Sequence, residues 1–219
     1  MEKIYVNRKE VASFDVDPQC GFSGICPDEL PVKGALEIVP ELNKQALKAG
    51  FRLASKDTHN PEGIWIATKE NPQFSPVGTK NVDIRWNRHC QVGTKGFEFL
   101  PFLPNPLEYD FVAYKGMEAD SHPYGACYQD LGDTRSTGVI EFLKVKNVTT
   151  VIVAGLALDY CVKTTAIQLK KAGFDVVVNL AGCKSIDFNG SKQAAIDEMA
   201  KLNIKFIESS EDIVILPWG

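Results

Sequence analysis

Four predicted strand ends in this chain carry ionisable side chains. Asp17 ends a β-rich run, Asp57 and His59 follow a second run, Lys115 follows a third, and Cys161 follows a fourth. In an open parallel sheet, ligands bind beyond the carboxyl ends of the strands. Any one of these residues could be a solvated loop residue, but together they predict a site.

Cys161 is the candidate nucleophile, because it opens a predicted helix. At a helix N-terminus the macrodipole and the free backbone N–H groups favour a thiolate and can bind a developing oxyanion. A buried structural cysteine is the alternative that this position alone leaves open.

The three histidines of the chain are His59, His89 and His122. The first two fall within or at the start of a long irregular segment, and Asp57 precedes His59 by two residues. Imidazole with carboxylate suits zinc, manganese or iron, so a divalent metal site is predicted. The alternative is a pair of ordinary loop histidines. His122 is interpreted as a loop residue, or at most as a neighbour of the pocket.

The positions of these residues depend on strands that alternate with helices. The predicted strands are residues 11–17, 51–56, 109–114, 149–155, 174–179 and 204–207, and the predicted helices are 39–49, 137–144, 160–172 and 191–202. Residues 149–155 are almost wholly apolar, as expected for a central strand buried on both faces. This order predicts an α/β fold with a parallel sheet of about six strands and helices on both faces.

A chain of 219 residues that is 44% hydrophobic can bury its core as one domain, 1–219. Residues 60–100 fit no regular pattern and are rich in glycine, proline and asparagine. A loop of that length inside a compact domain is usually functional or disordered. We therefore expect a long metal-binding loop over about residues 57–100.

The composition argues against several classes of partner. The formal charge of −4 and the scattered lysines and arginines do not suggest a nucleic-acid surface. Residues 1–11 are interrupted by charges, so neither a signal peptide nor a membrane span is expected, and a cytoplasmic location is predicted. The six cysteines lack CxxC spacing and are interpreted as thiols, which makes a redox-thiol protein a weak alternative.

Five motifs resemble those of the nicotinamidases, which also hydrolyse pyrazinamide and form the amidase branch of the isochorismatase-like cysteine hydrolases. VAGLALDYCV at 153–162 resembles the nucleophile segment, DPQ at 17–19 followed by Phe22 the first-strand motif, and YKG at 114–116 the catalytic-lysine motif. DTH at 57–59 and WNRHCQVGT at 86–94 resemble the metal segment. The motifs keep the family's order over about residues 11–180. The resemblance implies an isochorismatase-like, Rossmann-type sandwich.

The resemblance implies a catalytic role for three residues. Cys161 would attack the amide, and Asp17 would take its proton, protonate the departing ammonia and then activate water. Lys115 would hold both groups in their charged forms. The oxyanion hole would be the backbone N–H groups of Ala157 and Cys161, beside a cis peptide at Leu156–Ala157.

The resemblance also implies that Asp57, His59 and His89 hold one divalent ion, with zinc preferred and manganese or iron as alternatives. Family members usually have a further histidine or glutamate ligand between these positions, and this chain has no histidine there. Glu62 is the candidate, with Glu70 second. The ion would hold the pyridine nitrogen, directly or through water.

The substrate cavity should be small and aromatic. Phe22 and Trp86 match positions that flank the ring in the family, and Tyr124 would close the pocket; core packing is the alternative for Phe22. Asp159 is expected to orient the nucleophile loop or to cap the helix that follows.

The predicted reaction is hydrolysis of nicotinamide to nicotinate and ammonia in NAD salvage. A different small amide, or a non-catalytic metal- or ligand-binding module on the same fold, is the alternative. The chain could also form a homo-oligomer.

Overall fold

The computed structural model describes residues 3–217 and has a six-stranded parallel sheet at its centre. The strand order is β6-β3-β2-β7-β8-β9, and every neighbouring pair is parallel. The strands are β2 (Val11–Val16), β3 (Phe51–Asp57), β6 (Phe111–Lys115), β7 (Thr150–Leu156), β8 (Asp175–Lys184) and β9 (Lys205–Ile207). The predicted parallel sheet is confirmed.

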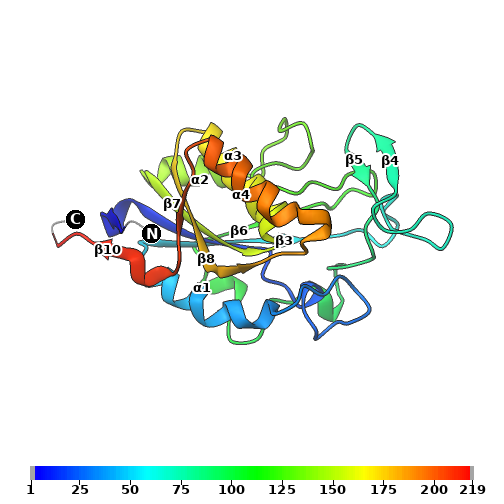
Figure 1. Ribbon diagram of the computed structural model, residues 1–219, viewed down its shortest axis with the longest axis horizontal. Coiled ribbons are helices and arrows are strands. Elements are labelled where there is room, and N and C mark those ends of the chain that lie inside the picture. Colours follow the sequence, from blue (N-terminus) through cyan, green and yellow to red (C-terminus); the bar gives the residue numbers. More distant parts are fainter. Residues whose placement is uncertain (1–2, 218–219) are drawn as a thin grey trace.

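Four α-helices cover the two faces of the sheet: α1 (Val39–Ala46), α2 (Val139–Val145), α3 (Lys163–Lys171) and α4 (Ser191–Lys201). Helix α1 lies on one face, and α2, α3 and α4 lie on the other (Figure 1). A central strand such as β7 is therefore covered by helices on both faces, and its residues from Val151 onward are buried. No helix within residues 3–217 is long and apolar enough to cross a membrane.

The sheet reverses its direction of growth beside β2. From this strand the chain adds β3 and β6 on one side, then returns to add β7, β8 and β9 on the other. The crevice at such a reversal, beyond the carboxyl ends of the strands, is where open α/β sheets bind ligands. The ends of β2, β3, β6 and β7 therefore determine the site.

Two short sheets lie outside the predicted elements. Strand β1 (Ile4–Val6) pairs with β10 (Ile213–Ile215), and β4 (Pro76–Thr79) forms a hairpin with β5 (Val82–Ile84). The hairpin lies at the end of the molecule opposite both chain termini (Figure 1). The sequence suggested that residues 60–100 have no regular structure, but they contain this short hairpin. These strands have only three or four residues, too few to show a period.

Candidate active site

Asp17 directly follows β2 in a left-handed conformation, with φ of 44°. Its backbone N–H donates to Ser55 Oγ at 3.2 Å, and that hydroxyl donates to Asp17 Oδ1 at 2.6 Å. Ser55 lies on the neighbouring strand β3. The turn and the serine together fix the direction of a fully buried carboxylate.

The end of β3 is tied to the same turn by the side-chain amide of Gln19. Its Oε1 accepts from Asp57 N at 2.7 Å, and its Nε2 donates to Asp57 O at 2.9 Å. Gln19 is fully buried. Its side-chain amide therefore takes the place of the backbone hydrogen bonds between β2 and β3 where these strands separate. The sequence contained Gln19 within a recognised motif but did not reveal this positioning role.

Lys115 brings the ends of four strands together. Its buried ammonium lies 3.1 Å from Asp17 Oδ2, also donates to Asp57 Oδ1, and lies 3.9 Å from Cys161 Sγ. Ligand atoms of Asp17, Asp57 and Cys161 all lie within 4.8 Å of one another. The structure therefore places the three predicted catalytic residues in one cluster.

Burial and this single cation determine the charges of the cluster. Burial raises the pKa of Asp17 to about 6, against the opposing effect of Lys115. Burial also raises the pKa of the Cys161 thiol well above its usual value, and Lys115 offsets this only in part. Burial would raise the pKa of Asp57 as well, but Lys115 and His59 hold it well below its usual range. At neutral pH the cluster thus pairs a thiol with a carboxylate that can accept its proton.

Cys161 lies in a π-helical turn, Leu158–Val162, between β7 and α3. Turns of this kind are frequent at functional sites. The peptide Leu156–Ala157 just before it is cis, as expected. At Gly155, with φ of 135°, an added Cβ would lie 2.0 Å from Val16 O, so only glycine lets β7 approach β2 here.

Asp159 anchors this turn through its carboxylate. Its carboxylate accepts from the backbone N–H groups of Ile186 and Asp187 at 3.1 and 2.8 Å, and from Ser191 Oγ at 2.6 Å. The expected orienting role therefore has a structural basis, because Asp159 connects the turn to the loop before α4.

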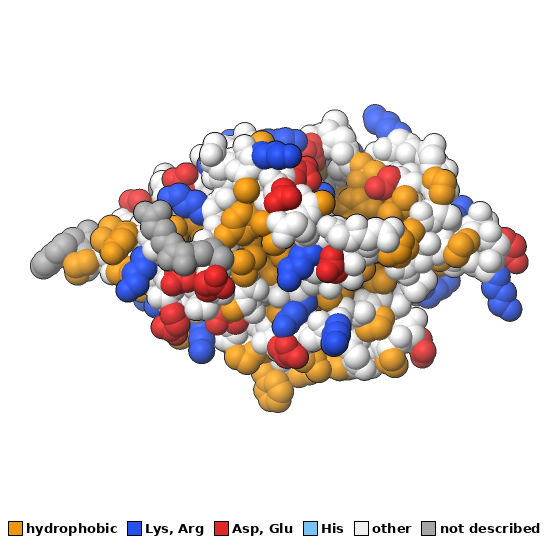
Figure 2. Space-filling model, viewed as in Figure 1, with side chains coloured by type: hydrophobic (Ala, Val, Ile, Leu, Met, Phe, Trp, Pro, Cys, Tyr) orange, Lys and Arg blue, Asp and Glu red, His pale blue; other side chains and the backbone are white. Residues whose placement is uncertain are grey.

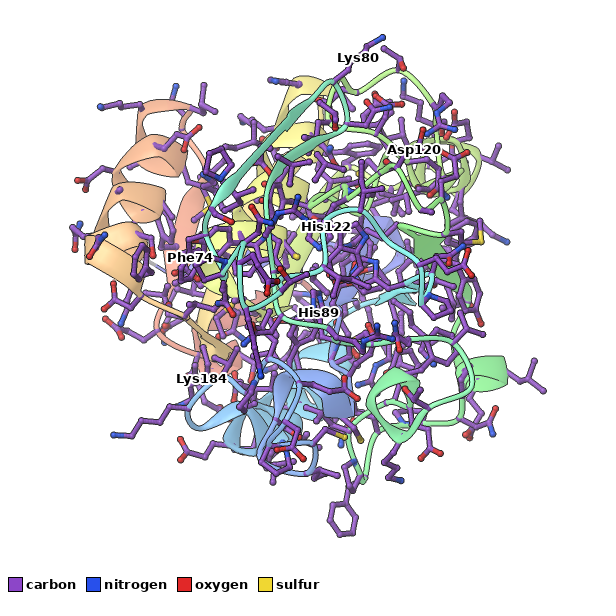
Figure 3. All side chains as sticks on the ribbon, turned by 90° about the vertical axis from the view of Figure 1, so that its right-hand side faces the viewer. Phe74, Lys80, His89, Asp120, His122 and Lys184 are labelled. Carbon is purple, nitrogen blue, oxygen red and sulfur yellow. The ribbon has the colours of Figure 1, made fainter. Side chains whose placement is uncertain are left out.

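A cluster of imidazoles lies beside the carboxylates. Ring nitrogens of His59, His89 and His122 all lie within 4.8 Å of one another. Asp57 Oδ2 lies 3.4 Å from His59 Nε2 and 3.7 Å from His89 Nε2. Figure 3 looks onto this end of the molecule, with His89 and His122 near its middle and Lys80 at the rim.

Backbone oxygens orient two of these rings. His59 Nδ1 lies 3.3 Å from Gly116 O, and His89 Nδ1 lies 2.6 Å from Asn87 O. A proton on each Nδ1 leaves Nε2 as a lone-pair donor facing Asp57, which is the usual support for a metal-ligating histidine. The buried Nε2 of His59 has no hydrogen-bond partner within residues 3–217. The donor set therefore fits a divalent ion.

A small cavity opens onto Cys161. Its lining consists of Phe22, Leu30, Asp57, Trp86, His89, His122, Tyr124, Ala157, Tyr160, Cys161 and Ile186. Space-filling atoms show hydrophobic side chains gathered around a hollow beside the β4–β5 hairpin (Figure 2). The predicted aromatic residues all face this cavity, and sequence reasoning missed Leu30, Tyr160 and Ile186.

The aromatic wall is held by hydrogen bonds. Trp86 Nε1 donates to Tyr124 Oη at 3.1 Å, and this hydroxyl donates to Asp83 Oδ1 at 2.8 Å. Asp83 belongs to β5, so the hairpin fixes the tyrosine that borders the cavity.

A family model described as the isochorismatase domain matches residues 16–211. The chain belongs to the isochorismatase family. This confirms the family resemblance of the motifs, and the matched residues include Asp17, Asp57, Lys115 and Cys161.

The relatives of this isochorismatase-family chain include nicotinamidases. A nicotinamidase from Acinetobacter baylyi is 32% identical over 203 residues, which are 91% of this chain and 92% of that protein. The solved structure of an Acinetobacter baumanii nicotinamidase and pyrazinamidase has a TM-score of 0.86 at 31% identity, covering 93% of this chain and 98% of that one. A Pyrococcus horikoshii pyrazinamidase in complex with zinc has a TM-score of 0.72 at 28% identity, covering 90% and 98%.

The structure does not bring Glu62 or Glu70 to the imidazole cluster of this isochorismatase-family site. Both side chains are exposed, and Glu62 begins a turn in which its backbone N–H donates to Asn60 Oδ1 at 2.9 Å. Neither Glu62 nor Glu70 therefore lies where the expected glutamate ligand would be. His122, interpreted from the sequence as a loop residue or at most a neighbour of the pocket, lines the cavity and also lies in the imidazole cluster.

Proposed function

We propose that this protein hydrolyses nicotinamide to nicotinate and ammonia through a thioester on Cys161. One observation carries the proposal: a buried thiol and carboxylate share the ammonium of Lys115 at the wall of an aromatic cavity that also reaches the imidazoles. The nicotinamidase relatives support the same reaction.

The cavity suits a flat heteroaromatic ring. Phe22, Trp86 and Tyr124 offer ring faces and edges for stacking, and such contacts hold aromatic ligands well. A ring held there would direct its carboxamide toward Cys161, which converts a bimolecular attack into a positioned one.

In the first half-reaction Asp17 accepts the thiol proton as Cys161 Sγ attacks the amide carbon. Asp17 then gives that proton to the nitrogen as the C–N bond breaks, so ammonia leaves and a thioester remains. The backbone N–H groups of Ala157 and Cys161 donate to the oxyanion. Lys115 stabilises the negative charge that passes between carboxylate and thiolate.

In the second half-reaction Asp17 takes a proton from water, and the resulting hydroxide attacks the thioester carbon. The C–S bond breaks, the proton on Asp17 returns to the sulfur, and the product leaves as nicotinate after its new carboxyl group loses its proton to solvent. One carboxyl group therefore serves both steps, which requires a pKa near the working pH. The raised pKa of Asp17, about 6, meets that requirement.

Asp57, His59 and His89 would hold one divalent ion, with zinc preferred because nitrogen and carboxylate ligands suit it. When bound, the ion would ligate the pyridine nitrogen directly or through water and so orient the ring. The zinc complex of the pyrazinamidase relative supports this assignment.

The reaction would return nicotinate to NAD salvage. The cytoplasmic location and the homo-oligomer stay predictions.

Ammonia release from nicotinamide tests the proposal. We expect Cys161→Ala to lower kcat/KM by at least about 10³-fold, because the nucleophile is lost. Cys183→Ala is the matched control, since this cysteine is equally buried, at 6% against 7%, but does not line the cavity.

Equal turnover by the parent and Cys161→Ala would exclude the cysteine mechanism. Ammonia release from another small amide, but not from nicotinamide, would indicate a different amidase. An inert parent whose Cys161 resists alkylation would indicate a binding module.

A further inference from the structure

His122 is a buried imidazole whose two ring nitrogens have no hydrogen-bond partner within the described part of the chain. Its side chain is 3% exposed, and neither ring nitrogen makes a hydrogen bond within residues 3–217. An unsatisfied buried polar group is destabilising, so native proteins rarely keep one without a ligand, an ion or a water. This ring has two such atoms.

The imidazole of His122 packs against both of the other imidazoles. Its ring stacks on His59 with centroids 4.9 Å apart and 14° between planes, and it lies 5.7 Å from His89 at 71°. Ring nitrogens of all three histidines lie within 4.8 Å of one another. Closely spaced imidazole nitrogens of this kind are suitable metal ligands.

Backbone contacts hold His122 in this place although it lies outside the 57–100 segment. His122 N donates to Asn81 O at 2.9 Å in the turn of the β4–β5 hairpin, and Ile64 N donates to Ala119 O at 2.8 Å. Two backbone hydrogen bonds therefore join the chain after β6 to the 57–100 segment.

Trp65 fills one side of the imidazole cluster. Its fully buried indole packs against all three imidazoles, with centroids 4.4 Å from His59, 5.2 Å from His89 and 4.7 Å from His122. A Cβ at Gly63 would lie 2.4 Å from Trp65 Nε1. The indole thus excludes a side chain at position 63 and occupies that side of the cluster.

We propose that His122 is a metal ligand, so that one ion is bound by His59, His89, His122 and the carboxylate of Asp57. The inference rests on the proposed metal site and replaces the glutamate ligand expected from the sequence. Three imidazoles with one carboxylate favour a borderline cation such as zinc over magnesium or calcium.

Such an ion would connect the two segments that form the cavity. His122 lies two residues before Tyr124, and His89 lies three residues after Trp86. The metal would therefore hold both parts of the aromatic wall, in addition to orienting the substrate.

Zinc affinity, measured by competition with a chromophoric chelator, tests the proposal without an activity assay. We expect His122→Ala to weaken zinc binding at least about 100-fold, because even residues that only support ligands change affinity 10- to 100-fold. Glu62→Gln, at the exposed alternative, should leave the affinity unchanged. His122→Cys should restore much of it, because a thiolate can replace the imidazole.

Cobalt absorption and thermal unfolding in chelator complete the experiment. His122→Ala should change the visible spectrum of the cobalt-loaded protein while the metal-free variant unfolds at the parent's Tm or above. Parental zinc affinity in His122→Ala together with a raised KM for nicotinamide would make His122 a substrate contact and overturn the proposal. Weaker zinc binding in Glu62→Gln would overturn it as well.

The result is separable from the proposed function. If the parent releases no ammonia from nicotinamide while His122→Ala still loses zinc, the function fails and the ligand assignment stands. If the parent is active and His122→Ala keeps its zinc, the reverse holds.

Discussion

Two buried carboxylates lie two residues apart at the end of β2, and only one of them belongs to the site. Asp15 and Asp17 are both fully buried, and burial raises the pKa of each to about 6. Each also faces a cation: Asp15 lies 2.7 Å from Arg52, and Asp17 lies 3.1 Å from Lys115. By burial and titration alone, the two could not be distinguished.

Their other partners differ. Asp15 accepts from the Tyr109 hydroxyl at 3.1 Å, so its neighbours are a phenol and a guanidinium that stays charged. Asp17 shares its ammonium with a second carboxylate, Asp57, and with a thiol that opens onto a cavity. A perturbed carboxyl group becomes a candidate catalyst when a nucleophile and an open space converge on it.

Replacing each carboxylate by an amide should separate Asp17 from Asp15 by the largest difference in activity. Asp17→Asn should lower kcat/KM for nicotinamide by about 10²- to 10⁴-fold, because the amide cannot accept the proton of Cys161. Asp15→Asn should keep kcat/KM within a few-fold and instead lower the free energy of unfolding by about 1–3 kcal/mol, since it weakens the contact with Arg52.

Steady-state ammonia release and chemical denaturation measure the two effects. The assay should be run at a temperature where both variants are folded by circular dichroism. Comparable loss of activity in Asp15→Asn and Asp17→Asn would mean that both carboxylates only support the fold at the end of β2.

The parts of the site that lie at strand ends could be predicted from the sequence. A run such as 149–155 identifies a buried strand by its apolar composition, and a parallel sheet places the residues that follow such strands at one edge. Asp17, Lys115 and Cys161 were found in this way, and their motifs then indicated the family, which is confirmed. Helix limits were less accurate: a helix predicted from 160 begins at Lys163, because a π-helical turn precedes it.

The parts that depend on contacts between loops could not be predicted. His122 enters the imidazole cluster through a backbone hydrogen bond to Asn81, and no periodicity or spacing encodes such a contact. Glu62 had a suitable position in the chain, but its turn directs the side chain to solvent. The role of Gln19 is likewise visible only once β2 and β3 are paired.

The acidic limb of the pH profile sharpens the comparison with a smaller effect. Asp17 must be ionised to accept a proton, so kcat/KM should be near its plateau above pH 7 and fall about tenfold per unit well below pH 6. Asp15 titrates in the same range, so Asp15→Asn is the control and should keep the limb in place. If the acidic limb disappears in Asp15→Asn, the titrating group is Asp15 and the prediction for Asp17 is wrong.

Single hydroxyl groups give the smallest effect and separate the two carboxylates most finely. Ser55 Oγ donates to Asp17 Oδ1 at 2.6 Å and thereby lowers its pKa, whereas Tyr109 does the same for Asp15. A hydrogen bond to an ionised group contributes about 1.5–3 kcal/mol, against about 0.5–1.5 kcal/mol for a neutral one. Because this difference is about 1 kcal/mol, Ser55→Ala should move the acidic limb of kcat/KM upward by about half a unit to one unit. Tyr109→Phe should leave it unmoved, because Asp15 exchanges no proton with Cys161. The same shift in both variants would show that the limb reports the general stability of the sheet instead of the protonation of Asp17.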